Sequence, residues 1–488
     1  MNELIIDCFA GGGGASVGIE MALGRCVDIA VNHDPQAILM HRTNHPDTLH
    51  LTEDMFTVDL QKYVGGRHVA LMWASPDCTS HSRANGGRPR KQGLRILPWA
   101  VYKHARVILP DVVIMENVAE IQQWGPLDGD GRPIREKRGE EYRRFIRSMK
   151  ALGYMFDSRE LVAADYGAPT TRKRWYAVFR RDGRDIVWPE QTHSKGGAGG
   201  LKPWEPIYKY LDMKDFGKSI FGRKKPLAEN TMKRIARGLE KFVFSCPEPF
   251  MVQVNHGGDN FRGHCLASPF LIQYHSETTE KGVRGQQATE PVQTIDTSNR
   301  YGLSMSYITK FYKTGTGQGV TEPIHTITTS PGHFGTVSVA AVDWKELQAA
   351  GMDEETAQKC TWVSQFLMEY YGCSTGQELR EPLHTIVTRD RFALVTVLRD
   401  EYVILDIFLR MLTPEELKLG QGFPADYIID RDYLWNTYPT AERVKRIGNS
   451  VVPVMAQKLV EANCSYLKTG ERTKNLRVDD SSPQLRFA

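Results

Sequence analysis

The first 190 residues alternate between short apolar runs and stretches whose hydrophobic positions have helical spacing. Short runs bounded by turn residues predict buried strands, here at residues 4–10, 28–32, 69–73, 111–115, 158–164 and 175–179. Residues 97–109 and 142–152 have the spacing of helices. This alternation indicates an α/β fold with a mostly parallel sheet and helices on both faces.

From about residue 190 to 405 the chain is rich in Thr, Gln, Gly and short β-favouring runs. The pattern Glu-Pro-x-x-Thr-Ile-x-Thr occurs, with small changes, at residues 290–297, 322–329 and 381–388. Imperfect copies of this kind predict a β-rich inserted module of hairpin-like units, whose polar loops would suit substrate recognition. A purely structural repeat would give the same pattern.

From about residue 406 the pattern again predicts alternating helices and strands. Thr413, Pro414 and Glu416 fit the N-cap, N1 and N3 positions of a helix, and residues 448–450 precede an apolar helix that runs towards residue 467. We therefore expect one domain built from 1–189 and 406–468, an inserted domain at 190–405, and a polar, disordered tail at 469–488.

Composition narrows the class of protein. The chain has 488 residues, 41% of them hydrophobic and 25% charged, as in soluble globular proteins of two or three domains. Eight cysteines without paired spacing predict reduced thiols in a cytosolic protein and no structural metal. We find no apolar run long enough to span a membrane. The net charge of only +4 makes the local clustering of basic residues more informative than their total.

One such cluster follows a cysteine. The apolar run at 69–73 predicts a strand that ends before Pro76, and Cys78 lies two residues after this proline. Reactive groups of α/β folds are often found at such junctions between a strand and a loop. No Asp or Glu occurs between Asp77 and Asp111, and the stretch at 83–95 after the cysteine carries five basic residues: Arg83, Arg88, Arg90, Lys91 and Arg95. A nucleophile beside a cationic loop predicts an enzyme acting on nucleic acid, although free cysteines are usually inert core residues.

A glycine-rich turn follows the first predicted strand. Residues 11–14 are all glycine and precede a helix candidate, an arrangement that lets a Rossmann-like fold hold a nucleotide against a helix N-terminus. Asp34 follows the second strand about twenty residues later, where such folds place a carboxylate on ribose hydroxyls, and Asp54 is an adenine candidate. Each aspartate alone is also a common helix cap or turn residue.

Two further sets of charged residues lie beside predicted strands. Glu116 ends an apolar strand, where a carboxylate acts either as a helix cap or as a proton donor in a cleft. Arg172, Lys173 and Arg174 begin the last strand of the first part, and basic residues beside a cleft suit phosphate or base contacts.

Six segments in this order resemble the cytosine-C5 DNA methyltransferases over nearly the whole chain. They look like the cofactor loop, the Pro-Cys motif, the Glu-Asn-Val motif, the Pro-Gln-x-Arg-x-Arg motif and the ninth and tenth motifs, and they lie at 7–14, 76–78, 116–118, 168–174, 412–424 and 448–451. In that family the long insert between the eighth and ninth motifs is the target recognition domain.

The resemblance implies a reaction and its residues. Cys78 would attack C6 of a cytosine flipped out of duplex DNA, Glu116 would hold or protonate N3, and Arg172 and Arg174 would fix the base and the thiol. S-adenosylmethionine would be the methyl donor, bound by Asp7, Phe9, Gly11, Gly13, Gly14, Asp34, Asp54, Asn449 and Ser450. The basic loop would close on the DNA.

Several positions depart from the family pattern. Asp77 stands where proline usually precedes the nucleophile, and its charge opposes ionisation of the thiol. Thr79 and Thr170 each replace a glutamine, and the ribose carboxylate aligns best with Asn32. These changes bear on individual contacts and leave the predicted reaction intact.

Three alternatives stay open at this point. They are an RNA methyltransferase of the tRNA type, a catalytically impaired DNA-binding relative, and a nicotinamide oxidoreductase that would explain only the glycine turn. We expect a monomer encoded by a bacterium or a phage. The sequence leaves open the recognised DNA word and whether a cognate restriction endonuclease accompanies the protein.

Overall fold

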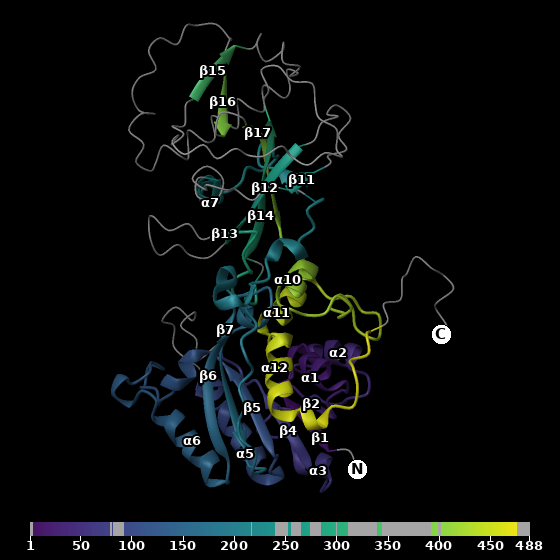
Figure 1. Cartoon of the computed structure of the whole chain (residues 1–488). Coiled ribbons are helices and arrows are strands. Elements are labelled where there is room, and N and C mark those ends of the chain that lie inside the picture. Colours follow the sequence, from purple (N-terminus) through teal and green to yellow (C-terminus); the bar gives the residue numbers. More distant parts are fainter. Residues whose placement is uncertain are drawn as a thin grey trace, which may run out of the picture. The chain divides into compact units, whose positions relative to one another are not determined.

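The computed structural model describes residues 3–78, 81, 92–215, 217–239, 252–254, 265–273, 285–298, 300–310, 339–343, 392–398 and 402–475 (Figure 1). The chain divides into two compact units. Unit 1 comprises residues 1–210, 291–299 and 413–488, and unit 2 comprises residues 211–290 and 300–412. Within the described ranges, no helix is both long enough and apolar enough to span a bilayer.

Unit 1 is built on a seven-stranded sheet among its described residues. The strand order is β3 (Leu49–Leu51), β2 (Ile29–Val31), β1 (Leu4–Cys8), β4 (Val69–Ala74), β5 (Val112–Asn117), β7 (Lys173–Arg180) and β6 (Met155–Val162). The first five of these strands are parallel, whereas β7 runs antiparallel to both β5 and β6. The predicted α/β class with a mostly parallel sheet is confirmed.

The predicted helices of unit 1 are present, together with four that were not predicted, at residues 35–44, 60–64, 92–95 and 440–449. The helices are α1 (Gly14–Leu23), α2 (Pro35–Asn44), α3 (Leu60–Val64), α4 (Gln92–Arg95), α5 (Leu97–Ile108), α6 (Glu140–Ala151), α10 (Pro414–Gly420), α11 (Thr440–Asn449) and α12 (Pro453–Cys464). Thr413 and Glu416 form the predicted capping box of α10, in which each side chain accepts a hydrogen bond from the other residue's backbone.

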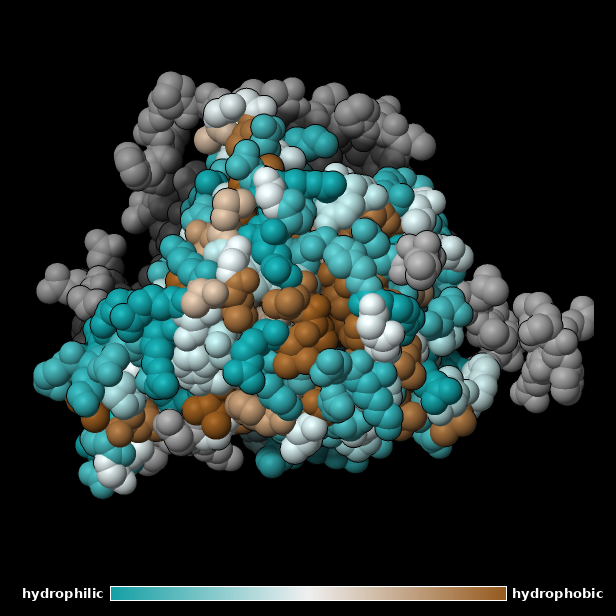
Figure 2. Space-filling model, turned by 90° about the horizontal axis from the view of Figure 1, so that it is seen from below, coloured by the Kyte–Doolittle hydropathy of each residue, from teal (hydrophilic) through white to brown (hydrophobic). Residues whose placement is uncertain are grey.

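Both faces of the sheet are covered, because successive residues of a strand point to opposite sides. Leu4, Ile6 and Cys8 of β1 pack into the layer formed with α3, α5 and α6. Ile5 faces the other layer, which contains α1 and α12. Figure 1 shows α12, near the end of the chain, beside α1 near its start. Seen from below, the surface is largely hydrophilic, with a hydrophobic area near its centre (Figure 2).

Unit 2 contains an antiparallel sheet among its described residues, with the order β11 (Val252–Val254), β12 (Cys265–Gln273), β14 (Tyr301–Lys310), β17 (Tyr402–Met411), β16 (Phe392–Leu398) and β15 (Val339–Asp343). β10 (Lys218–Ser219) pairs with β17, and β13 (Gly285–Gln287) pairs with β12. Helix α7 (Glu229–Leu239) buries Ile235, Ala236 and Leu239. The second and third repeat copies lie outside the described residues.

The units differ from the expected domain bounds at four places. Residues 406–412, expected in the first domain, belong to unit 2. Residues 190–210, with the short strands β8 (His193–Ser194) and β9 (Lys202–Pro203), belong to unit 1. So do residues 291–299, which contain most of the first repeat copy. Residues 469–475, expected in a disordered tail, make specific contacts: the Thr469 amide donates to the Leu23 carbonyl at 2.8 Å, and Arg472 pairs with Asp426.

The close packing of α1 on α12 gives a test of the fold. A side chain at Gly18 would collide with the Pro453 carbonyl and come within 2.7 Å of the Ala456 Cβ. We expect Gly18→Ala to lower the free energy of unfolding by about 1–3 kcal/mol in urea titrations, because the two helices must separate. Gly129→Ala, where the added methyl group meets nothing within 4 Å, is the control. Equal losses in the two variants would contradict this packing.

Candidate active site

Three neighbouring strands bring the predicted catalytic residues to one edge of the sheet. Cys78 follows β4, and Glu116 lies near the end of β5. These two strands are parallel, so they end at the same edge. Because β7 is antiparallel to β5, its beginning lies at that edge too, and Arg174 is there with Arg172 just before it. The direction of β7 therefore carries the two arginines to the glutamate and the thiol.

The charged side chains at this edge are paired and mostly buried. Arg174 Nε lies 3.2 Å from Glu116 Oε1, and the two side chains are 13% and 9% exposed. Arg172 donates from Nη1 to the carbonyl oxygens of Ile295 and Gly448, at 3.1 and 3.0 Å. Burial lowers the pKa of Arg172 to about 10, which leaves it a cation at neutral pH. The site thus holds two cations beside one carboxylate.

Asn117 holds the loop that carries the cysteine. Its Nδ2 donates to the Pro76 carbonyl at 3.0 Å, and its Oδ1 accepts from the Val118 amide at 2.9 Å. Both contacts are buried, so the Asn117 amide fixes the path of the chain two residues before Cys78. The Glu-Asn-Val segment was singled out in the sequence for its glutamate, and the structural role of its asparagine was missed.

Opposing charges act on the Cys78 thiol. Burial raises its pKa most strongly, the Arg174 and Arg172 guanidinium groups lower it, and the Glu116 and Asp77 carboxylates raise it. The net result is a raised pKa, so the thiol is protonated at neutral pH in the free protein. The concern that Asp77 opposes ionisation is confirmed in direction, but burial contributes more than Asp77.

The first repeat copy contributes backbone to this site. The Thr171 amide donates to the Val292 carbonyl at 2.8 Å, and the Val292 amide donates to the Pro169 carbonyl at 2.9 Å. Gly448 has no side chain, and the Asp296 carbonyl occupies the space that a Cβ would need. Residues 291–298 therefore support the arginine segment, a role that the repeat alone did not reveal.

The glycine turn adopts the strained shape that its sequence predicts. Gly11 and Gly13 have φ values of 53° and 89°, in the left-handed region that favours glycine. Phe9 has φ 63°, which is uncommon for a bulky residue and occurs mainly where the surroundings enforce it. Gly13 is the N-cap of the ten-residue helix α1 and offers no side-chain cap, and within the first turn the Ser16 amide donates a hydrogen bond to the buried Asp7 carboxylate.

The remaining cofactor candidates lie in different settings. Ser450 lies against the turn, with its Oγ 3.5 Å from the position of a Cβ built on Gly12, and its Cβ 3.0 Å from one built on Gly14. Asp34 is the N-cap of α2 and accepts from the Gln36 amide at 2.9 Å. Asp54 is exposed and accepts from the Phe56 amide at 2.7 Å, and Asn449 is exposed at the end of α11. Asp34 and Asp54 thus make the helix-cap and turn hydrogen bonds that the sequence offered as the alternative to cofactor binding.

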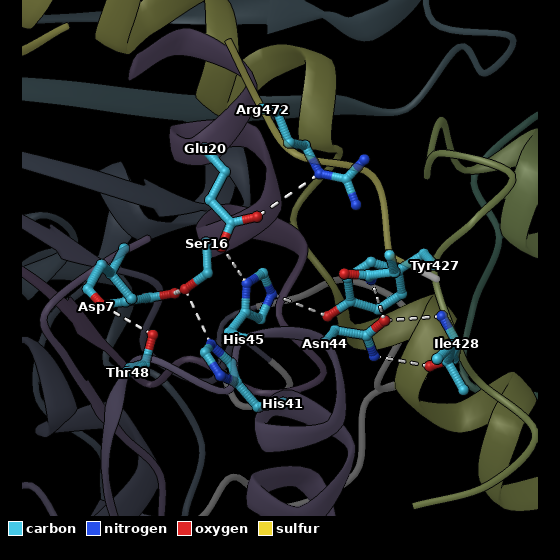
Figure 3. A network of polar contacts seen from close by, with 12 residues as sticks. Asp7, Ser16, Glu20, His41, Asn44, His45, Thr48, Tyr427, Ile428 and Arg472 are labelled. Carbon is cyan, nitrogen blue, oxygen red and sulfur yellow. Dashed lines mark hydrogen bonds and ion pairs between the residues drawn. The ribbon is translucent and has the colours of Figure 1, made fainter. Parts of the chain in front are cut away.

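Asp7 is fully buried beneath the turn, within a chain of polar side chains (Figure 3). Ser16 Oγ donates to Asp7 Oδ2 at 2.7 Å, and His41 Nε2 lies 2.9 Å from that hydroxyl. His41 Nδ1 lies 2.8 Å from His50 Nε2. Burial raises the pKa of Asp7 to about 7 and lowers the pKa of His50 to about 4. Asp7 therefore supports the turn from within, and its Oδ1 has no hydrogen-bond partner among the described residues.

The predicted DNA-binding residues Arg83, Arg88, Arg90 and Lys91 lie outside the described residues, as does Thr79.

The sequence did not predict a role for Tyr427. Its hydroxyl donates to the Gly12 carbonyl at 2.7 Å, across 415 positions of the chain. No local pattern in the sequence marks this tyrosine as a partner of the glycine turn.

Comparison with known proteins gives one matching family. Residues 4–203 match the protein family described as C-5 cytosine-specific DNA methylase. The chain is similar to type II methyltransferase M1.HphI of Haemophilus parahaemolyticus, with 28% identity over 213 residues that cover 41% of this chain and 52% of that protein. It is also similar to type II methyltransferase M.AquIA of Picosynechococcus sp., with 28% identity over 222 residues, 42% of this chain and 87% of that one.

The chain thus spans about half the length of the first of these relatives. Among solved structures, a DNMT2 mutant of Spodoptera frugiperda is similar with a TM-score of 0.46 and 15% identity, and the alignment covers 94% of this chain and 98% of that one.

The charges around Cys78 predict its reactivity. In Arg174→Gln, the thiol loses the cation that most lowers its pKa and Glu116 loses its partner, so the pKa of Cys78 should rise further. Below its pKa, a thiol alkylates about threefold more slowly for each unit of increase, because the loss of thiolate outweighs the gain in its nucleophilicity. We expect slower iodoacetamide labelling of Cys78 at pH 8, measured by peptide mass spectrometry. Arg147→Gln, at an exposed position of α6, is the control. Equal labelling rates would contradict this electrostatic assignment.

Asp7 should make stability fall with pH. Its pKa in the folded chain, about 7, lies above the ordinary 3.8, so the folded state binds more protons than the unfolded state between these values. The free energy of unfolding should therefore decrease as pH rises from about 4 to about 7. In Asp7→Asn this dependence should flatten in urea titrations across that range. An unchanged slope would show that Asp7 titrates alike in both states.

Proposed function

We propose that the chain, whose residues 4–203 match the C-5 cytosine-specific DNA methylase family, transfers a methyl group from S-adenosylmethionine to C5 of cytosine in duplex DNA. The observation that carries this proposal is the constellation at one sheet edge: a thiol with a buried glutamate–arginine pair and a second buried arginine beside it. Each of these groups has a task in the reaction.

Cytosine C5 is a weak nucleophile, and the thiol would overcome this. The Cys78 thiolate adds to C6, a C–S bond forms, and the electron pair of the C5–C6 double bond moves to C5. Glu116 takes up the proton that the Cys78 thiol loses and shares it with N3, which keeps negative charge from accumulating on the ring. C5 would then bond to the methyl carbon as the bond from that carbon to the donor sulfur breaks. A base would remove the proton from C5, the C5–C6 double bond would re-form, and the C–S bond at C6 would break to release the Cys78 thiolate.

The arginines and the loop would set the geometry. Arg174 orients Glu116 through the 3.2 Å ion pair, and Arg172 is held by two backbone carbonyls, so both guanidinium groups are preorganised. The faces of a base-paired cytosine are covered by the neighbouring stacked bases, so the cytosine must leave the duplex for a thiol to add to C6. The basic residues of 83–91 are the candidates for closing on the DNA backbone.

The glycine turn suits the proposed cofactor. S-adenosylmethionine, when bound, supplies an electrophilic methyl group on a sulfonium sulfur. Gly11, Gly13 and Gly14 allow a close approach to the backbone, Phe9 offers a ring for the adenine, and Ser450 lies against the turn. Asp34 and Asp54 would accept from the ribose hydroxyls and the adenine amino group, and Asn449 would complete the site.

Replacing the nucleophile tests the function. We expect Cys78→Ser to abolish methyl transfer to duplex DNA and to leave the dissociation constant for S-adenosylmethionine unchanged, because the thiolate serves only the base. Cys26→Ser, at a partly exposed cysteine outside the sheet edge, should keep the wild-type kcat at saturating S-adenosylmethionine. Radiolabelled methyl transfer and calorimetric titration measure the two properties. Full activity of Cys78→Ser would exclude the mechanism.

The same assay should identify the substrate. Duplex DNA and tRNA are tested in parallel, and duplex DNA containing 5-fluorocytosine should form a denaturation-resistant adduct with the wild-type protein. Transfer to tRNA alone would replace the proposed substrate, and absence of any adduct would indicate a binding protein without catalysis. Bisulfite sequencing of DNA from expressing cells then gives the recognised sequence.

A further inference from the structure

Four side chains from distant parts of the chain meet at the glycine turn, and no catalytic step uses them. They are Glu20 of α1, His45 at the end of α2, Tyr427 after α10, and Arg472 near the end of the described chain (Figure 3). All four have side chains that are 10% exposed or less. Buried polar groups at a ligand-binding turn need a physical reason, because their burial is costly unless they are paired.

Tyr427 contacts the turn directly. Its hydroxyl donates to the Gly12 carbonyl at 2.7 Å, and it occupies the space that any side chain at position 13 would need. Burial raises the pKa of Tyr427 well above its ordinary value, so the hydroxyl keeps its proton for this bond. The peptide between Gly12 and Gly13 is therefore fixed by a residue that is far away in the sequence.

His45 and Glu20 hold the tyrosine hydroxyl in place. His45 Nε2 lies 3.3 Å from the Tyr427 oxygen, and His45 Nδ1 lies 2.5 Å from Glu20 Oε1. The imidazole thus bridges the hydroxyl to a carboxylate, an arrangement that sets the ring orientation. The Glu20 carboxylate itself belongs to α1, the helix that the turn leads into.

Arg472 closes the other side of the network. Its Nε lies 3.6 Å from Glu20 Oε2, and its Nη1 and Nη2 donate to the two Asp426 oxygens at 3.2 and 2.8 Å. The Asn475 amide donates to the same aspartate at 2.7 Å. Asp426 directly precedes Tyr427, so this pair fastens the tyrosine's own segment to the end of the described chain.

A metal site is the competing explanation for part of this network. The ligand atoms of Glu20, Cys26 and His45 all lie within 4.8 Å of one another. However, His45 Nδ1 and Glu20 Oε1 are 2.5 Å apart, whereas two ligands about 2.0–2.1 Å from one tetrahedral zinc lie roughly 3.3 Å apart. The Arg472 cation also lies beside Glu20. A hydrogen bond accounts for the contact better than a shared metal.

We propose that Tyr427 is a positioning residue, which holds the Gly12–Gly13 turn in the shape that binds S-adenosylmethionine and is itself oriented by His45 and Glu20. This inference rests on the proposed function, and it adds residues that the cofactor does not touch. Without the hydroxyl, the Gly12 carbonyl loses its bond and the turn can sample other shapes, so the cofactor must select the competent one. Affinity for the cofactor should fall, while the chemistry at Cys78 should not change.

The test is Tyr427→Phe, which removes one oxygen from a buried ring. Loss of one buried hydrogen bond should raise the dissociation constant and the KM for S-adenosylmethionine on the order of 5- to 10-fold. The kcat at saturating cofactor and the KM for DNA should stay at their wild-type values. Tyr433→Phe, at an exposed tyrosine of the same segment, is the matched control and should leave all four values unchanged.

A double-mutant cycle tests the orienting role of Glu20. Glu20→Gln weakens the contact with His45 and leaves the Tyr427–Gly12 bond in place, so it should raise the cofactor KM by less than Tyr427→Phe. The two changes combined should weaken binding by less than the product of the single effects, because both act through one hydroxyl. If Tyr427→Phe does not fold, unchanged cofactor binding in Glu20→Gln alone overturns the proposal.

The possible outcomes are distinct. Unchanged cofactor affinity in a folded Tyr427→Phe overturns the positioning role, and so does a fall in kcat with an unchanged KM. A loss of thermal stability with wild-type affinity would show a purely structural residue and overturns it as well. If the wild-type protein does not bind S-adenosylmethionine in the calorimeter, the proposed function fails instead. Zinc found in stoichiometric amount in the purified protein would support the metal site and overturn the proposal.

Discussion

The site depends on one buried ion pair, between Glu116 and Arg174. Both side chains are almost inaccessible to water, so neither charge is tolerable there without the other. The pair forms because β7 enters the sheet antiparallel to β5, which places the start of β7 beside the end of β5. A parallel strand in the same position would begin at the opposite edge. The direction of a single strand thus decides whether the glutamate, the arginines and the thiol form one site.

The second constraint is that the two ends of the chain must meet. Helix α12 packs on α1 through the missing side chain of Gly18, and Ser450 and Tyr427 reach the glycine turn from segments more than 400 residues away. The turn itself is strained, with Phe9 and two glycines at positive φ. Strain of this kind persists only where surrounding contacts enforce it, and here the late segments supply those contacts. The glycine turn is therefore complete only when residues 427–475 have folded back onto the first part of the chain.

Local sequence patterns predicted much of this fold and site because they are determined locally. The apolar runs gave β1, β4 and β5, and the Thr413–Glu416 spacing gave the α10 capping box. Cys78, Glu116 and Arg174 were predicted from their places at strand ends. The roles of Asn117, Ile295 and Tyr427 were not predictable, because each depends on contact with a distant backbone carbonyl or on the path of a loop. The sequence around Asp34 is compatible both with a cofactor ligand and with a helix cap. The hydrogen bond from the Gln36 amide, which identifies the cap, is evident only in the structure.

The charges around Cys78 explain how its side chain can be a protonated thiol in the free protein and a thiolate nucleophile in the proposed reaction. Two guanidinium groups oppose two carboxylates around it, and burial tips the balance towards the protonated thiol. In the proposed reaction Glu116 shares a proton with the cytosine ring, which removes one of the two negative charges that raise the pKa of Cys78. Asp77 is exposed, so water and salt screen its charge, whereas Glu116 is buried and acts at nearly full strength. Binding of the base at Glu116 and ionisation of the thiol therefore favour each other, and the nucleophile forms where its substrate already lies.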